Sequence, residues 1–279
     1  MNFTKMQGTG NDFIIINAFK EQIIEKDYPS IAQKMCDRHF GIGADGIILA
    51  LPSQKENIRM RIFNADGSEA EMCGNGIRCF ALFANNEGLI SKNKFSIETL
   101  TGRIFPEIIE LTSNNKAMIK VDMGMPFLEA KDIPVNLIGK GPFLKQIMQI
   151  DGENIEYTPI GMGNPHCIIV TQEITDAIVH KIGPAIENNT KLFPKRTNVE
   201  FVKIISRTKA EVRVWERGSG ETLACGTGTC ATVVAGIING YFDNEVTIKL
   251  LGGELVINWT QGQSVFMTGP SEVVFSGNY

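Results

Sequence analysis

The sequence has few of the residues that build metal and disulfide sites. Its 279 residues include only 6 cysteines and 3 histidines. No two cysteines are separated by just two residues, so the usual spacing of zinc and iron–sulfur ligands is missing. The sequence therefore predicts neither a metal centre nor a fold held together by disulfides.

Two further shortages limit the class of protein. Positive charge is not in excess, because 27 lysines and arginines face 31 aspartates and glutamates, and a basic surface for nucleic acid is therefore not expected. No apolar run reaches the roughly 18 residues of a membrane span, and the first ten residues lack the pattern of a secretory signal. With 43% hydrophobic and 21% charged residues, we expect a globular protein of the cytoplasm that binds neither nucleic acid nor membrane.

An internal repeat is the most informative pattern that is present. The aligned blocks, each given with its second copy, are Gly8–Ile16 with Gly161–Ile169, Gly46 with Asn198, and Arg61–Gly76 with Arg213–Gly228. The offset is 153 residues in the first block and 152 in the other two, and it places Cys73 on Cys225. Each half of the chain is therefore interpreted as a copy of one ancestral domain.

Each copy has the pattern of an α+β unit. Short β-branched or alternating runs predict the strands 13–16, 59–63, 95–100 and 103–105 in the first copy, and 167–170, 211–215, 246–250 and 254–259 in the second. One apolar helix is predicted in each, over 77–84 and 230–238, with a stop at Gly88 and Gly240. We expect mainly antiparallel strands around one helix, and two copies related by a pseudo-twofold axis.

A cysteine precedes Gly-x-Gly at the start of the predicted helix in both copies. The unpaired N–H groups of a first turn favour a thiolate, and they can also hold a carboxylate. Two such sulfurs on opposite sides of one carbon can take a proton from one face and deliver a proton to the other. The pattern predicts inversion of an amino-acid stereocentre without an organic cofactor, and the sequence contains no dinucleotide or P-loop motif.

Other readings of these residues stay open. A single cysteine before a glycine-rich turn is more often a buried packing residue, and packing is the expected role of Cys36, Cys79, Cys167 and Cys230. A catalytically idle small-ligand binding protein or a thiol redox sensor is the alternative from another class. The duplication of both the cysteine and its Gly-x-Gly argues against these alternatives.

Polar residues beside the turns suggest a ligand with charges of both signs. They are Asn11, Asn64, Asn164, Asn198, Glu216 and Arg217. A guanidinium can grip a carboxylate through two hydrogen bonds, so Arg217 is the candidate for a second carboxylate of the ligand. His166 is either a core histidine or a group that tunes a neighbouring thiol.

Four segments closely resemble the diaminopimelate epimerase family: GTGNDF at 8–13, RIFNADGSEAEMCGNGIR at 61–78, GMGNPH at 161–166 and ERGSGETLACGTGTCA at 216–231. The resemblance implies interconversion of LL- and meso-2,6-diaminopimelate without pyridoxal phosphate, a step of lysine and peptidoglycan precursor synthesis. It implies Cys73 and Cys225 as the acid/base pair. The implied substrate contacts are Asn11, Asn64, Gly74, Asn75, Asn164, Asn198, Glu216, Arg217, Gly226 and Thr227, and His166 and Glu216 are implied to modulate the thiols. A looser likeness to proline racemase leaves another cofactor-independent racemase as the alternative enzyme.

The resemblance also implies the domain organisation. Each domain is expected to be a barrel-like sheet around a central helix, with the active site in the cleft between the two. The implied domains are 1–124 with 269–279, because a strand near 272–275 returns to the first domain, and 125–268. Some members of the family have Gln where this chain has Gly46, so no side-chain contact can be transferred to that position. Whether the chain forms a homodimer stays open.

Overall fold

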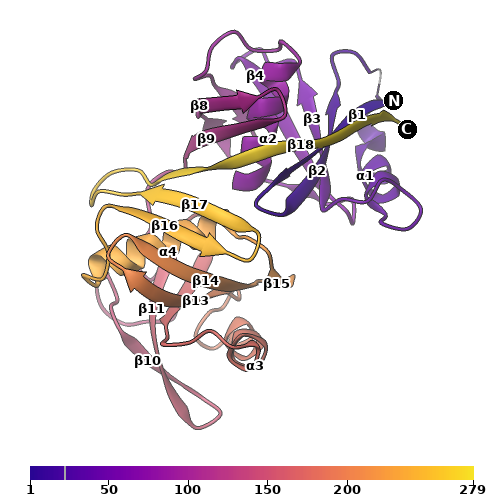
Figure 1. The fold of residues 1–279 in the computed structure, drawn as a ribbon. Helices are drawn as coiled ribbons and strands as arrows, with labels where there is room; N and C mark the ends of the chain where they lie inside the picture. Colours follow the sequence, from indigo (N-terminus) through magenta and orange to yellow (C-terminus); the bar gives the residue numbers. More distant parts are fainter. Residues whose placement is uncertain (22) are drawn as a thin grey trace. The chain divides into compact units, whose positions relative to one another are not determined.

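The chain divides into two units. The computed structural model describes residues 1–21 and 23–279. Unit 1 consists of Met1–Asp122 with Thr268–Tyr279, and unit 2 consists of Met123–Met267 (Figure 1). No helix in the described part of the chain is long and apolar enough to cross a membrane.

Unit 1 is a sheet wrapped around one helix. Its helices are η1 (Glu25–Asp27), α1 (Tyr28–Cys36) and α2 (Gly74–Asn86). Its strands are β1 (Asn2–Gly8), β2 (Asn11–Asn17), β3 (Gly46–Leu51), β4 (Ile58–Asn64), β5 (Glu69–Ala70), β6 (Ile97–Thr99), β7 (Gly102–Ile104), β8 (Pro106–Ser113), β9 (Lys116–Asp122) and, from Thr268 onward, β18 (Phe266–Asn278). Helix α2 contacts β1, β2, β3, β8 and β9, so it lies on the inner face of this sheet.

The outer face of the sheet in unit 1 is covered by α1. Ala32 and Met35 of α1 pack against Ile14, Ile16 and Leu49 of β2 and β3. Because β2 is covered on both faces, its central residues form a continuous apolar run and do not alternate with polar residues.

Unit 2 repeats this arrangement with its own elements. Its helices are α3 (Asp176–Glu187) and α4 (Gly226–Ile238), and its strands are β10 (Gln146–Ile150), β11 (Glu153–Gly161), β12 (Pro165–Val170), β13 (Asn198–Ser206), β14 (Lys209–Glu216), β15 (Gly220–Thr222), β16 (Glu245–Leu250) and β17 (Gly253–Asn258). Helix α4 contacts β11, β12, β13 and β17 on one side of the sheet. On the other side, Val179 and Ile186 of α3 pack against Val199 and Phe201 of β13.

The duplication extends to the register of the strands. Most pairings are antiparallel, and the parallel pair β2–β3 in unit 1 has its counterpart in β12–β13 of unit 2. Phe13 lies opposite Gly46 in the first pair, and His166 lies opposite Asn198 in the second. These partners are the residues that the repeat aligns. The predicted α+β fold with duplicated, mainly antiparallel domains is confirmed.

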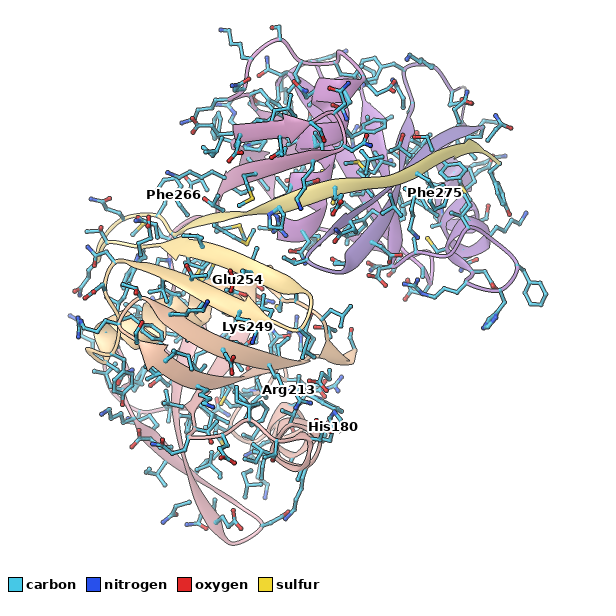
Figure 2. All side chains as sticks on the ribbon, viewed as in Figure 1. His180, Arg213, Lys249, Glu254, Phe266 and Phe275 are labelled. Carbon is cyan, nitrogen blue, oxygen red and sulfur yellow. The ribbon has the colours of Figure 1, made fainter. Side chains whose placement is uncertain are left out.

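An ion pair is also duplicated. The Arg61 Nε and Glu69 Oε1 atoms are 2.6 Å apart, and the same atoms of Arg213 and Glu221 are also 2.6 Å apart. In unit 2 the carboxylate of Glu221 is shared with His180 Nε2 at 2.7 Å, and Figure 2 labels His180 and Arg213 of this group. These arginines hold short strands to β4 and β14, so their role is structural.

The prediction of one helix per copy was incomplete, because α1 and α3 are also present. Each is short or carries residues that disfavour helices, with Pro29 in the first turn of α1 and Gly183 and Pro184 inside α3. Helices α2 and α4 begin several residues before the predicted starts, since glycines of their first turns obscure the helical pattern. Their predicted stops were close, because Gly88 and Gly240 adopt φ values of +67° and +80° just past the helix ends.

Candidate active site

Cys73 and Cys225 cap the N-termini of α2 and α4 with the same geometry. The Cys73 sulfur accepts a hydrogen bond from the Gly76 N–H at 3.4 Å, and the Cys225 sulfur accepts one from the Gly228 N–H at 3.4 Å. Both cysteines have extended backbone conformations, as N-cap residues usually do. The predicted position of each cysteine, directly before a helix, is therefore confirmed.

In unit 1 the Cys73 sulfur lies beside two asparagines of the predicted site. The Asn11 Oδ1 atom accepts hydrogen bonds from the Cys73 Sγ at 3.4 Å and from the Asn75 Nδ2 at 3.3 Å. The other end of the Asn11 amide donates from Nδ2 to Asp45 Oδ2 at 2.6 Å. Since a carboxylate only accepts, Asp45 fixes the orientation of the Asn11 amide and turns its oxygen toward the sulfur.

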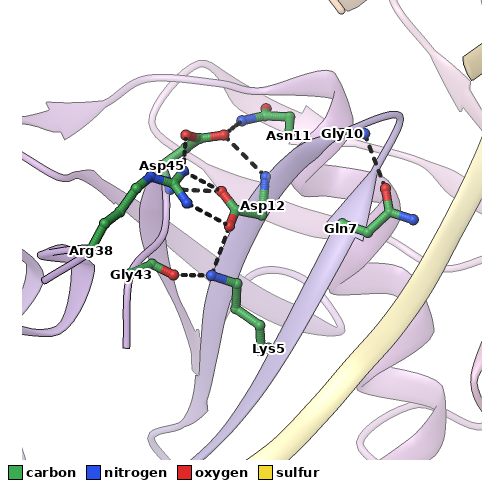
Figure 3. Close-up of polar contacts among 8 residues, drawn as sticks. All are labelled: Lys5, Gln7, Gly10, Asn11, Asp12, Arg38, Gly43 and Asp45. Carbon is green, nitrogen blue, oxygen red and sulfur yellow. Dashed lines mark hydrogen bonds and ion pairs between the residues drawn. The ribbon is translucent and has the colours of Figure 1, made fainter. Parts of the chain in front are cut away.

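Asp45 belongs to a charged cluster behind Asn11, shown in Figure 3. Asp12 Oδ2 is 2.7 Å from Lys5 Nζ, and Arg38 bridges Asp12 and Asp45 with Nη2 contacts of 3.0 and 2.8 Å. Burial raises the pKa of Asp12, but hydrogen bonds from Arg38 and Lys5 and their positive charges outweigh it, so the pKa lies below its ordinary value. This cluster was not predicted from the sequence.

Replacing Asp12 with Asn is expected to destabilise unit 1 by about 3–5 kcal/mol at pH 7, because the buried ammonium of Lys5 loses its carboxylate partner. A carboxyl group whose pKa is lowered by folding stabilises the fold above its unfolded pKa and loses that contribution as the pH falls. The difference from the unchanged protein should therefore shrink below pH 3.8, the ordinary pKa of Asp12. Urea unfolding at pH 7 and near pH 3 measures both quantities.

The matched control for this substitution is Asp243→Asn. Asp243 pairs with Arg207 at 2.7 Å, but both side chains are more than half exposed. Such surface pairs contribute less than about 1 kcal/mol. An equal loss of stability in the two variants would show that the Lys5–Asp12 pair is not the source of the effect.

In unit 2 the Cys225 sulfur lies among ionisable groups. The carboxyl of Glu216 acts electrostatically on it, and Thr227 Oγ1 lies 3.5 Å from Sγ. Burial raises the pKa of Glu216, whose Oε1 atom accepts a hydrogen bond from Thr222 Oγ1 at 2.5 Å. His166 lies on β12 with Nε2 at 2.8 Å from Asn164 Oδ1, so the structure brings two further predicted site residues together.

The expectation of a lowered thiol pKa is wrong for Cys225. Burial, together with the carboxylates of Glu216 and Glu200, raises its pKa well above the ordinary value. The N–H of Gly228 acts in the opposite direction but is outweighed. A helix N-terminus therefore does not by itself produce a thiolate here, because desolvation and nearby negative charge dominate.

The remaining predicted residues lie at the ends of the strands and in the first helical turns. Asn198 Oδ1 accepts from the Arg217 N–H at 2.9 Å, and the Arg217 side chain donates to the Lys195 carbonyl at 3.0 Å. Asn64, at the end of β4, donates from Nδ2 to Ser68 Oγ at 3.0 Å. Gly74 begins α2, and Gly226 begins α4.

Gly46 and the other cysteines have structural explanations. A Cβ atom at Gly46 would lie 2.6 Å from the Phe63 carbonyl oxygen, so the close approach of β3 and β4 requires glycine as the chain is arranged. Cys36, Cys79, Cys167 and Cys230 are buried, in agreement with the packing role predicted for them. Burial raises the pKa of Cys36 and of Cys79 to about 12.

The described residues contain no cluster of three or more His, Cys, Asp or Glu side chains that could hold a metal ion.

One group that was not predicted from the sequence is the carboxyl of Glu200, which lies next to His166. The available signal was an acidic residue inside the apolar run Asn198–Val202, where a core-facing position is normally hydrophobic.

Comparison with known proteins identifies the family. The family model for diaminopimelate epimerase matches residues 3–128 and 158–274. The diaminopimelate epimerase of Pelotomaculum thermopropionicum is 47% identical over 282 residues, with 100% of this chain and 99% of the relative covered.

Solved structures share the fold at low sequence identity. A phenazine biosynthesis protein of the PhzF family from Bacillus anthracis has a TM-score of 0.71 at 17% identity, covering 99% of this chain and 98% of its own. A probable proline racemase from Agrobacterium radiobacter has a TM-score of 0.68 at 11% identity, covering 100% and 92%. At these identities the likeness concerns the fold alone, whereas the family model and the close relative span nearly the whole sequence. The chain belongs to the diaminopimelate epimerase family.

Proposed function

We propose that this protein interconverts LL- and meso-2,6-diaminopimelate, with Cys73 and Cys225 as the two acid/base residues. As a member of its family the chain is an isomerase that acts on a small molecule. The single observation that carries the proposal is the duplicated cysteine N-cap, in which each sulfur sits on the first turn of a buried helix. Packing alone does not require the same thiol twice.

The proton transfers balance without another reactant. One cysteine enters as a thiolate and removes the α-proton, while the other enters as a thiol and donates its proton to the opposite face of the carbon. The product leaves with the roles of the two sulfurs reversed, and a turnover in the opposite direction or proton exchange with water restores the first state. Each sulfur therefore needs access to one face of the same α-carbon in the working enzyme.

The carbanion formed between the two transfers requires stabilisation, because an amino-acid α-hydrogen is very weakly acidic. The first-turn N–H groups around Gly74 and Asn75, and around Gly226 and Thr227, are suited to bind the α-carboxylate as negative charge moves onto it. Donors that are already oriented cost little reorganisation during the reaction. We expect the chemistry to proceed with no cofactor.

We assign substrate contacts to the polar residues around the two caps. The proposed contacts are Asn11, Asn64, Gly74, Asn75, Asn164, Asn198, Glu216, Arg217, Gly226 and Thr227. Arg217 would hold the second carboxylate of diaminopimelate, because a guanidinium matches that group in shape and charge. His166 and Glu216 would adjust the protonation of the thiols.

The proposal includes two domains, which comprise residues 1–124 with 269–279 and residues 125–268. It also includes a cytoplasmic location and the absence of nucleic-acid partners. A homodimer is the assembly to test. A homodimer is checked by sedimentation of the purified chain. No specific feature of the described residues favours proline as the substrate over diaminopimelate.

Exchange of the α-hydrogen with solvent deuterium tests the proposed reaction. The reduced protein, incubated in D2O with LL- or meso-diaminopimelate and no added cofactor, is expected to incorporate deuterium at the α-carbon and to yield both isomers. Proline serves as the comparison substrate and should remain unlabelled. Failure of exchange in a folded, reduced sample, or a requirement for pyridoxal phosphate, would refute the proposal.

A further inference from the structure

A buried histidine–glutamate pair lies beneath the first turn of α4. His166 Nδ1 and Glu200 Oε1 are 2.7 Å apart, and both side chains are 0% exposed. The second carboxylate oxygen, Oε2, is also buried and has no hydrogen-bond partner within the described part of the chain. Burying such groups is costly, and apolar residues of similar size are often at least as stabilising. Stability alone is therefore a poor explanation for this pair.

Unit 1 provides an internal control for the same place in the fold. The repeat aligns His166 with Phe13 and Glu200 with Ile48. Phe13 and Ile48 lie against Gly76 in the first turn of α2, with atoms 3.5 and 3.2 Å from an ideal Cβ built there. An apolar pair is thus compatible with this architecture, and the ionisable pair is a special feature of unit 2.

Glu200 lies close to the Cys225 sulfur. A Cβ atom built on Gly228 would be 2.4 Å from Glu200 Oε1 and 3.2 Å from Cys225 Sγ. The carboxylate and the sulfur therefore flank the same glycine. The hydrogen bond from His166 fixes the carboxylate in this place, and the other ring nitrogen of His166 faces Asn164.

We propose that Glu200 is a positioning residue for Cys225, whose carboxylate, anchored on His166 beneath α4, keeps the Cys225 sulfur protonated in the free protein. The inference deepens the proposed function, on which its catalytic meaning rests. It assigns the two cysteines different resting states, with Cys225 as the thiol. A turnover from this resting state begins with proton removal by Cys73 and ends with proton donation by Cys225.

The charged groups around Cys225 in unit 2 support this assignment. Two acidic groups act on it from neighbouring strands, Glu200 on β13 and Glu216 on β14, and His166 on β12 contacts Glu200. On its own helix, Thr227 and the Gly228 N–H contact the sulfur. Both carboxylates oppose a thiolate, and burial acts in the same direction on the pKa of Cys225.

The test measures the reactivity of the Cys225 thiol in the free protein. Glu200→Gln keeps the size of the side chain and removes its charge. The rate of alkylation by iodoacetamide is followed at several pH values, and labelled Cys225 and Cys73 peptides are quantified separately by mass spectrometry. The midpoint is the pH at which the alkylation rate of Cys225 reaches half of its maximum. In Glu200→Gln we expect this midpoint to fall by about one pH unit, so that Cys225 is alkylated about tenfold faster at pH values below the midpoint.

Two further variants control for charge and for folding. Glu211→Gln removes one carboxylate from the surface of β14, where Glu211 pairs with Lys249, and should leave the Cys225 midpoint unchanged. The double variant His166→Phe, Glu200→Ile recreates the apolar pair of unit 1 and should also lower the midpoint. If neither Glu200 variant shifts the midpoint relative to Glu211→Gln while remaining folded by circular dichroism, the proposed role of Glu200 is wrong.

Alkylation does not depend on turnover, so this result stands apart from the outcome of the deuterium experiment. For an active enzyme, the pH profile of kcat/KM adds a second readout. Activity is lost at high pH when Cys225 deprotonates, so this alkaline limb should move to lower pH in Glu200→Gln. An unmoved limb with a reduced maximum would indicate a purely structural role and would also overturn the inference.

Discussion

Replacing Cys73 or Cys225 with Ala is expected to lower epimerisation of diaminopimelate by about 10²–10⁴-fold, because each sulfur carries protons for one face of the substrate. Removal of the acid stops reprotonation with inversion, and removal of the base stops formation of the carbanion. The two single variants should therefore be similarly impaired, and the double variant should be little worse than either one. Steady-state rates from a chiral separation of the two isomers measure the effect.

The cysteine variants need a control for the loss of a buried thiol. Cys36→Ala is suitable, since Cys36 is a buried thiol that packs in the cluster between α1 and the sheet and does not cap a helix N-terminus. It should retain near-normal turnover while losing some stability. Near-normal turnover in either Cys73→Ala or Cys225→Ala would instead exclude a mechanism with two bases.

Gly228→Ala is expected to be far more damaging than the equivalent substitution Gly76→Ala. The added methyl group at Gly228 would lie 2.4 Å from the buried Glu200 Oε1, whereas the one at Gly76 would meet the Ile48 side chain at 3.2 Å. Overpacking of this kind costs about 1–3 kcal/mol, against a gain of up to about 1 kcal/mol for alanine over glycine in a helix. Gly76→Ala should thus be nearly neutral in stability.

The two glycine variants also differ in the expected activity. At Gly228 the carboxylate and the first turn of α4 must move apart, which displaces the Cys225 cap and should reduce kcat by at least about tenfold. Thermal unfolding and steady-state kinetics of both variants test this. Equal effects at the two positions would mean that the carboxyl of Glu200 can move away without consequence.

Much of this architecture follows from patterns that are local in the sequence. The strands around Phe13 and Trp215 have apolar or alternating runs of residues. The helices that follow the two cysteines are bounded by glycines. The offset of about 152 residues then predicts the duplication, and the paired register of β2–β3 and β12–β13 agrees with it. Repetition makes weak local signals reliable because the same signal occurs twice.

The features that sequence reasoning missed depend on contacts between distant residues. Asp45 is an ordinary loop residue until β3 places its carboxylate on Asn11, 34 residues earlier. In the sequence, Glu200 is only an acidic residue within an apolar strand. Its surroundings appear in the structure, where it contacts His166 and lies against the first turn of α4. The raised pKa of Cys225 has the same origin, since it depends on burial and on carboxylates from other strands.

The strand order of unit 1 has a consequence for how the chain is made. Strand β1 pairs with β18, Asn2 lies opposite Asn278, and Figure 1 shows the two strands side by side with the chain termini together. On the ribosome β1 emerges first, but its partner follows only after all of unit 2 has been translated. At about 5–20 residues per second, unit 1 waits on the order of ten seconds or more with an unpaired β1 edge. Unit 2 is continuous and can fold earlier, so the half of the molecule that is synthesised first is expected to be completed last.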